Sequence, residues 1–247
     1  IEDSSSTLGE GYSFAGSSVM SDTNGNLLFY TDGYSVWNRQ HQVMPHGNLG
    51  NSFTRGTQAS LCIPKPESDS QYYIFTSRRI DSPHPMFYCE VDMNLDNGYG
   101  DVTDIVNLPD YCDNPEKLAA FYHKNKTDIW VITRSFSFQR YTSLLITKDG
   151  INLDPVFSPA PPVDFKYNMD FIGLMKISYD KKYLITCYGG GTSSRSRVEV
   201  CSIDSKTGLI DHLYHFKLRY IIPNNPFYRT YSCEFSPDSK YMYLGGT

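Results

Sequence analysis

An acidic stretch of this chain has the residue types that bind calcium. Asp92–Gly98 alternates oxygen-bearing side chains with other residues, as a calcium-binding loop does. Such a loop requires Gly at its sixth position and Glu at its twelfth, whereas here Gly98 is seventh and Thr103 is twelfth. A similar stretch that begins at Asp22 departs from the pattern as well. We therefore predict solvated hairpin turns at both places, with no bound metal and no other cofactor.

A glycine-rich stretch, Gly189–Ser194, follows a predicted strand and suggests a phosphate-binding loop. It lacks the Gly-Lys-Ser/Thr ending of such loops. A strand rather than a helix is predicted after it, so the helix N-terminus that binds phosphate is missing. We interpret the stretch as a loop between strands. Arg195 and Arg197, which come shortly after it, are our candidates for a local contact with an anion.

Histidines and serines form no catalytic motif in this sequence. His41 and His46 flank a turn without a third metal ligand or a paired carboxylate near them in sequence, so we expect solvent-facing loop residues. The Gly-x-Ser-x-Gly motif of a nucleophilic serine does not occur. Carboxylates from separate repeats could still converge, and Asp32, Asp170 and Glu234 are the candidates. Turn formation explains such residues equally simply.

The six cysteines leave two interpretations open. No CxxC occurs and no histidine stands at metal-ligand spacing beside them, which argues against zinc. Buried free thiols on strands and disulfides of an oxidising compartment both fit the pattern. If disulfides form, we expect them between predicted neighbouring strands, joining Cys62 to Cys89 and Cys187 to Cys201.

The segment 134–140 is our candidate contact loop. Its large side chains are Arg134, Phe136, Phe138 and Arg140, separated by Ser and Gln. Aromatic residues offer a large contact area, which suits protein and sugar ligands alike. The alternative is a hairpin whose aromatic rings fold back onto its own sheet.

The composition indicates a large hydrophobic core and many strands. Of the 247 residues 40% are hydrophobic and 15% are aromatic, and aromatic residues suit half-buried pleated surfaces. The net charge of −5 disfavours nucleic acid as a partner. No apolar run approaches the about 20 residues that span a bilayer. The start at Ile1 suggests a processed or internal piece of a longer protein.

Short apolar runs between polar turns predict an all-β fold. An Asn-Gly turn precedes the run Leu27–Thr31 and an Asp-Gly turn follows it, and both dipeptides accept the positive φ angles of tight hairpins. The pattern recurs in Ile177–Ile185 and in Phe235–Tyr243, which lie 58 residues apart. A repeated four-stranded unit is typical of a β-propeller.

We predict a single β-propeller domain over residues 1–247, of the WD40-like or YVTN-like kind, with four-stranded antiparallel blades. About four and a half blades fall within the chain, near residues 12–48, 58–108, 116–157, 173–216 and, in part, 231–247. The last has room for two strands, and an open blade exposes an unpaired edge. We therefore expect one to three further blades from beyond Thr247 or from elsewhere.

The sequence of Asp22–Gly33, continued by Val36–Gly47, resembles the N-terminal propeller of a family of large secreted Bacteroidota proteins. The resemblance continues through Ile63–Pro66, Tyr72–Thr76, Val91–Leu95, Gly100–Thr103, Glu116–Ala119, Trp130–Thr133 and Phe235–Tyr243. Proteins of this family often end in a gliding-motility-associated or type IX secretion sorting domain. The resemblance implies secretion across the outer membrane, surface display, and a propeller that binds or scaffolds other proteins.

We therefore expect a non-catalytic binding or scaffold module of a secreted or cell-surface protein, linked to type IX secretion or gliding motility. Its partners would be proteins at the cell surface or outer membrane, and it would not itself span the membrane. A carbohydrate-active propeller enzyme similar to glycoside hydrolases, with carboxylates around its central channel, is one alternative. A glycan-binding lectin propeller is another, which exposed Trp or Tyr at equal positions in each blade would favour.

Overall fold

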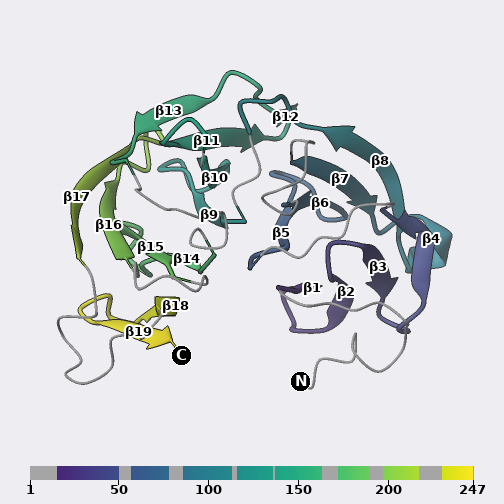
Figure 1. Cartoon of the computed structure of the whole chain (residues 1–247). Helices are drawn as coiled ribbons and strands as arrows, with labels where there is room; N and C mark the ends of the chain where they lie inside the picture. Colours follow the sequence, from purple (N-terminus) through teal and green to yellow (C-terminus); the bar gives the residue numbers. More distant parts are fainter. Residues whose placement is uncertain are drawn as a thin grey trace.

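The structure is a computed structural model that describes residues 16–49, 57–77, 86–112, 116–135, 137–162, 172–189, 197–216 and 230–246. Within these ranges the chain forms five antiparallel β-sheets. The sheets follow one another along an arc, each with its first strand toward the middle of the molecule and its last strand toward the periphery (Figure 1). The predicted all-β propeller of four-stranded antiparallel blades is confirmed.

Consecutive strands pair in the first two sheets, and in the third sheet both β12 and β13 pair with β11. The first sheet contains β1 (Ser18–Ser21), β2 (Leu27–Thr31), β3 (Ser35–Asn38) and β4 (Val43–Asn48). The second contains β5 (Ser60–Pro64), β6 (Gln71–Thr76), β7 (Phe87–Asp92) and β8 (Asp101–Asn107), with the helical turn η2 (Asp96–Gly98) before β8. The third contains β9 (Leu118–Tyr122), β10 (Ile129–Ser135), β11 (Arg140–Thr147), the short β12 (Gly150–Ile151), and β13 (Val156–Pro159), which also pairs with β11.

The last two sheets differ in size. The fourth contains β14 (Met175–Ile177), β15 (Tyr183–Tyr188), β16 (Arg197–Ile203) and β17 (Ile210–Phe216). The fifth contains β18 (Thr230–Phe235) and β19 (Met242–Gly246). No helix in the described part of the chain is long and apolar enough to cross a membrane.

Hydrophobic side chains fill the space between each pair of neighbouring sheets. β10 shows this arrangement most clearly, because all its residues are buried. Val131 packs toward the second sheet, while Trp130 and Ile132 pack toward the fourth. A strand covered on both faces has no need for alternating polar residues, which explains its almost continuous apolar sequence.

The turn between β14 and β15 has the same hydrogen bonds as the turn between β18 and β19. Ser178 Oγ donates to the Asp180 carboxylate at 2.7 Å and accepts from the backbone N–H of Tyr183 at 2.9 Å. The equivalent atoms 58 residues later are 2.6 and 2.9 Å apart. The Ser178 hydroxyl also lowers the pKa of Asp180. The repeat in the sequence is therefore a repeat of turn geometry.

One side chain connects the innermost strands of three sheets. Gln58 lies two residues before β5, and its Nε2 donates to the backbone oxygens of Leu118, at 2.8 Å, and Met175, at 3.1 Å. Its Oε1 accepts from the backbone N–H groups of the same two residues, at 3.4 and 2.8 Å. The amide uses both donors and both acceptor positions. Because β9 and β14 begin at Leu118 and Met175, Gln58 fixes where these strands begin relative to β5.

Replacement of Gln58 by alanine should destabilise the fold. It leaves four backbone groups without partners in a partly buried place, and an unpaired buried polar group costs about 1–3 kcal/mol. Solvent can satisfy some of them, so we expect Gln58→Ala to lower the free energy of unfolding by about 3 kcal/mol, measured by urea denaturation. Gln42→Ala, in an exposed turn, is the matched control. Equal stability of the two variants would contradict this role of Gln58.

Candidate functional site

A buried cluster of charged and hydroxyl side chains lies between the third and fourth sheets. Arg134 and Tyr141 face each other on β10 and β11, and Tyr188 and Glu199 come from β15 and β16. Glu199 Oε2 accepts hydrogen bonds from the hydroxyls of Tyr141, at 2.9 Å, and Tyr188, at 2.8 Å. Arg134 Nε lies 3.6 Å from the same oxygen. One carboxylate thus joins the facing surfaces of two sheets.

Arg197 supplies a second cation to this cluster. Its Nη2 lies 3.0 Å from Glu199 Oε1, and its Nη1 donates to the backbone oxygen of Pro162 at 3.0 Å. The side chains of Arg134 and Glu199 are fully buried. Burial, together with the Glu199 carboxylate, raises the pKa of Tyr141 well above its ordinary value, so this hydroxyl stays protonated. The cluster therefore contains two guanidinium groups and one carboxylate held by ion pairs, and within the described residues Arg134 Nε, Arg197 Nε and Nη2, and Glu199 Oε1 form no hydrogen bond.

This arrangement changes the role of two predicted contact residues. Arg134 cannot belong to a surface contact loop, because its side chain is fully buried against Glu199. Arg197 is 7% exposed and also points inward, so it is not an exposed anion site. The sequence analysis missed Glu199. Arg197 and Glu199 lie two residues apart on one strand and hence on the same face, between apolar neighbours, which is the sequence pattern that could have indicated a buried pair.

Of the remaining residues of the two predicted contact sites, the structure describes two and leaves two outside its described ranges. The guanidinium carbon of Arg140 lies 4.5 Å from the ring centre of Phe138 and 3.7 Å from that of Phe157 on β13. Phe138 thus packs against Arg140 of its own sheet and remains 51% exposed. Phe136 and Arg195 lie outside the described residues.

A second buried cation, Lys117, precedes β9 and was not singled out from the sequence. Its Nζ donates to the backbone oxygens of Gly173, at 2.6 Å, and Cys187, at 2.8 Å. It also lies 4.7 Å from the ring centre of Tyr188. Burial penalises the ammonium form and lowers the pKa of Lys117 to about 7. The group therefore changes its charge near neutral pH inside the protein.

A channel opens at the far ends of the innermost strands. Its cavity of about 400 Å³ lies at the ends of β5, β9 and β14, away from Gln58. The lining residues are Leu61, Cys62, Ile63, Pro64, Ala120, Phe121, Tyr122, Ile129, Ile177, Ser178, Tyr179 and Lys181. Tyr122 is 43% exposed and Tyr179 is 60% exposed, and Lys181 Nζ lies 5.2 Å from the ring centre of Tyr122. The channel therefore has mostly apolar walls and a mouth with two tyrosines and a cation.

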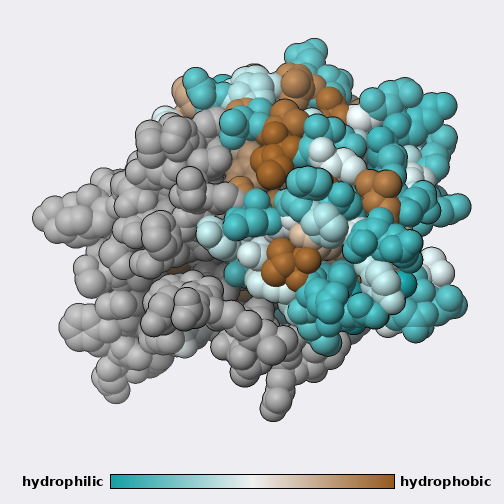
Figure 2. All heavy atoms as spheres, turned by 90° about the vertical axis from the view of Figure 1, so that its right-hand side faces the viewer, coloured by the Kyte–Doolittle hydropathy of each residue, from teal (hydrophilic) through white to brown (hydrophobic). Residues whose placement is uncertain are grey.

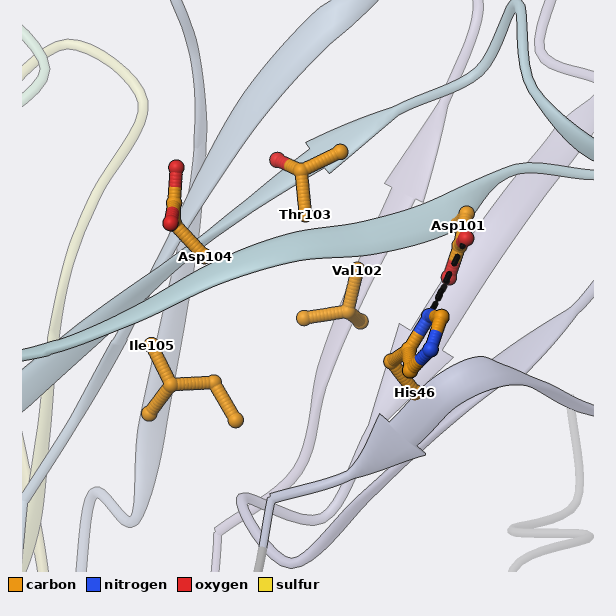
Figure 3. Close-up of a pocket in the computed structure, with 6 residues that line it drawn as sticks. All are labelled: His46, Asp101, Val102, Thr103, Asp104 and Ile105. Carbon is orange, nitrogen blue, oxygen red and sulfur yellow. Dashed lines mark hydrogen bonds and ion pairs between the residues drawn. The ribbon is translucent and has the colours of Figure 1, made fainter.

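A shallower groove of about 520 Å³ lies between the outer strands β4 and β8. Figure 3 shows His46 pointing at Asp101, with Nδ1 3.2 Å from each carboxylate oxygen. Consecutive residues of β8 up to the 49% exposed Ile105 form the rest of its lining. Viewed from the side that carries β4 and β8, the hydrophobic atoms form separate patches among hydrophilic ones (Figure 2). His46 is exposed as predicted, but it lies in a strand and has a carboxylate partner that is 55 residues distant.

The predicted calcium and carboxylate candidates lie in turns or on the surface. Asp92 Oδ1 accepts the backbone N–H of Asn94 at 2.9 Å, which stabilises the turn before η2. Asp32 accepts two backbone N–H groups of its own turn, each at 2.8 Å, and Glu234 forms a 3.2 Å surface ion pair with Lys176. Asp170 lies outside the described residues. Within the described ranges, no three His, Cys, Asp or Glu side chains are grouped closely enough to hold a metal ion.

Neither predicted disulfide forms, since all six cysteines are free thiols. Cys62 and Cys89 both lie opposite Ile74, on either side of β6, so two strand spacings separate them. That distance of about 9.6 Å exceeds the reach of a disulfide. Cys187 and Cys201 do lie on neighbouring strands, but they belong to the cores on opposite faces of the fourth sheet.

The comparisons with known proteins give information about the fold of this chain. No protein-family model matches the sequence, and no curated protein sequence matches it. The structure is similar to a functionally unknown protein from Desulfotomaculum acetoxidans, with a TM-score of 0.52 and 9% identity over 92% of this chain and 64% of that one. It is also similar to the hydrazine synthase of Kuenenia stuttgartiensis, with a TM-score of 0.47 and 14% identity over 92% and 54% of the two chains. The C-terminal WD40 domain of Sif2 gives a TM-score of 0.42 and 11% identity over 93% and 66%.

This chain therefore spans between 54% and 66% of the length of these three similar structures. At such low identity the likeness describes the arrangement of the sheets and says nothing of what the chain binds or catalyses. The function must be argued from the side chains themselves.

Neutralising Glu199 should strongly destabilise the protein. Glu199→Gln keeps the side-chain shape but leaves two buried guanidinium groups without a counter-charge, a change that costs about 3–5 kcal/mol. Glu234→Gln breaks an exposed ion pair and should cost less than about 1 kcal/mol. Urea denaturation of both variants measures the difference. Equal losses would show that the Arg134 and Arg197 charges do not depend on Glu199.

Lys117 should make the stability depend on pH. Its pKa is 10.5 in the unfolded reference and about 7 in the fold, so between these values the unfolded chain binds more protons. The free energy of unfolding should therefore rise with pH in this window, by up to about 1.4 kcal/mol per pH unit. Lys117→Met should remove this contribution. Urea denaturation from pH 7 to 8.5 compares the two slopes, to which the six cysteines common to both proteins contribute equally, and identical slopes would refute the assignment.

Proposed function

We propose that this chain is a non-catalytic binding module, and that it binds a protein segment at the mouth of its central channel. The channel is the observation that supports this proposal. Its walls come from Leu61 on the second sheet, Ala120 on the third and Ile177 on the fourth, and its mouth exposes Tyr122 and Tyr179. A concave apolar site bordered by exposed aromatic rings is the typical anchor point of a binding surface.

The chemistry of the mouth indicates the type of segment that fits. An apolar or aromatic side chain of a partner would fill the channel and lose its contact with water. Tyr122 and Tyr179 would then cover it, because tyrosine combines a large apolar ring with a hydroxyl that stays hydrated. Lys181, above the Tyr122 ring, favours an acidic group next to the inserted side chain. The expected ligand is therefore an extended peptide with an apolar anchor and a neighbouring carboxylate.

The positions of the ionisable groups support a binding role over a catalytic one. A glycoside hydrolase requires two carboxyl groups that reach the substrate. The described residues that line the channel comprise apolar, hydroxyl, thiol and ammonium side chains, with no carboxylate among them. Glu199 is buried between two sheets, and its partners come from the same two sheets. Catalysis would therefore need groups other than these.

We further propose that the protein is secreted or displayed at the cell surface, with type IX secretion or gliding motility as its setting. The basis is the resemblance of Asp22–Gly33 and Val36–Gly47 to the secreted Bacteroidota propellers. An oxidising environment would suit the buried cysteines as well as a reducing one. Detection of the native protein by protease shaving of intact cells would test the surface location, and full protection from protease would contradict it.

Glycan binding is the second candidate, and the two exposed tyrosines favour it. The rings of Tyr122 and Tyr179 come from neighbouring sheets and border one opening. A sugar ring has an apolar face that packs on tyrosine, so the same mouth could take a saccharide in place of a peptide. A peptide would place a hydrocarbon side chain in the channel, whereas a glycan would place a hydroxylated ring there. The apolar walls of the channel suit the hydrocarbon side chain better.

Selection from a random peptide display library tests the binding proposal. We expect enriched peptides with an aromatic or aliphatic anchor and a neighbouring acid. Their affinity should fall at least about tenfold, or 1.4 kcal/mol, when both Tyr122 and Tyr179 are replaced by alanine. Tyr214→Ala is the matched control, since this tyrosine is 52% exposed on the outer strand β17. Equal affinity of the double variant and the control would overturn the channel as the site.

Two further measurements separate the alternatives. Binding to a glycan array that Tyr122→Ala and Tyr179→Ala abolish, together with an empty peptide selection, would favour the lectin role. Hydrolysis of a panel of glycosides and lactones, at a rate proportional to enzyme concentration and independent of the preparation, would contradict a non-catalytic role.

A further inference from the structure

Two thiols meet in the core between the fourth and fifth sheets. Cys187 lies on β15 and Cys233 on β18, and both belong to the same hydrophobic cluster. The backbone oxygen of Leu174 accepts a hydrogen bond from Cys187 N at 2.9 Å and one from Cys233 Sγ at 3.8 Å. A side-chain hydrogen bond between the two thiols and burial raise the pKa of Cys233 well above its ordinary value. The Leu174 carbonyl group therefore accepts from the Cys187 backbone and from the Cys233 thiol, and the two thiols are neighbours in one core.

The other four thiols lie in the cores between other pairs of sheets. Two strand spacings across β6 separate Cys62 from Cys89. Cys201 faces the opposite core of the fourth sheet, and Cys112 lies in the core between the second and third sheets. Of the six cysteines, Cys187 and Cys233 are the pair that a disulfide can join without moving a strand past another.

We propose that Cys187 and Cys233 form a disulfide that joins the fourth sheet to the fifth when the protein meets a small oxidised thiol such as glutathione disulfide. One cysteine thiolate attacks the small disulfide, forms a mixed disulfide and releases one small thiol. The second cysteine thiolate then attacks the protein sulfur of the mixed disulfide and releases the other small thiol. Two protein S–H bonds are replaced by one S–S bond, and the small disulfide is reduced to two thiols, which take up both protons.

The position of these cysteines explains how a buried pair can react. Cys233 lies on β18, which packs on the fourth sheet through the core that contains both thiols, and local opening of this core exposes them. Lys117 Nζ is bonded to the Cys187 backbone oxygen at 2.8 Å, and the fraction of Lys117 that is protonated near pH 7 favours a thiolate beside it. Once formed, the disulfide would prevent this opening, because it ties the fifth sheet to β15.

The experiment compares the reduced chain with the chain incubated in glutathione disulfide under native conditions. After alkylation of free thiols and digestion without reductant, mass spectrometry should detect a peptide pair linked through Cys187 and Cys233. The oxidised protein should melt about 10 °C above the reduced protein, because the cross-link restrains the unfolded chain. Cys233→Ala should abolish both effects, whereas Cys201→Ala should retain them.

Alkylation of both Cys187 and Cys233 in the oxidised sample would overturn the proposal. Linkage of either residue to glutathione alone, or to another cysteine, would overturn it as well. If Cys233→Ala does not fold, the peptide map of the wild-type chain decides alone. The result does not depend on the binding role of the channel, since peptide binding and disulfide formation are measured separately.

Discussion

The arrangement of the inner strands depends on the side-chain amide of Gln58. Where three sheets converge, the first backbone groups of β9 and β14 lie too close to the axis to be paired by another strand. A buried backbone N–H or C=O group that remains unpaired is costly, so a side chain must pair with them. One amide, with two donors and two acceptor positions, bonds both Leu118 and Met175. The Gln58 amide thus joins β9 and β14 at one end of the inner strands, and the apolar channel lies at the other end.

The buried charges between the third and fourth sheets restrict how these two sheets can slide past each other. Apolar contacts hold neighbouring sheets at a given separation, but they are not directional and tolerate sliding. The Glu199 carboxylate is satisfied only when Tyr141 and Tyr188 from the two sheets reach it together. Such buried ionic networks contribute little net stability compared with a packed apolar core, and in some proteins they specify one arrangement. Because Arg134 and Arg197 are used in this way, they are unavailable for ligands, and the proposed binding site consists of tyrosines and apolar walls instead.

Local patterns predicted the elements of this fold well. The run Leu27–Thr31 is found as the strand β2 with the same bounds, and the predicted recurrence at Ile177–Ile185 contains the turn that leads into β15. These segments are short apolar runs between polar turns, and the turns depend on residues within five positions of one another, such as Ser178 and Tyr183. Information of this kind is present in any short window of the sequence.

Contacts between sheets could not be predicted in the same way. His46 pairs with Asp101 and Tyr141 bonds Glu199 across 55 and 58 residues, and no local pattern connects them. The cysteines show that a disulfide cannot be predicted from knowing which strands are neighbours. Cys187 and Cys201 do lie on adjacent strands, yet Cys187 pairs with Val198, and the three-residue offset turns Cys201 to the other face. The sequence predicts which strands are neighbours, but without the register it does not predict which of their side chains face each other.

The two copies of the repeated turn differ at residues that line the candidate binding site. Lys181 and Ser239 occupy equivalent positions 58 residues apart, and both have left-handed backbone angles, with φ of 61° and 59°. The turn therefore requires the backbone conformation and not the side chain, because neither residue is glycine and the two differ in charge and size. At the position of Tyr179 the next repeat has Pro237. The turn geometry thus explains neither Tyr179 nor Lys181, whereas a ligand at the channel mouth, which both residues line, gives each of them a role.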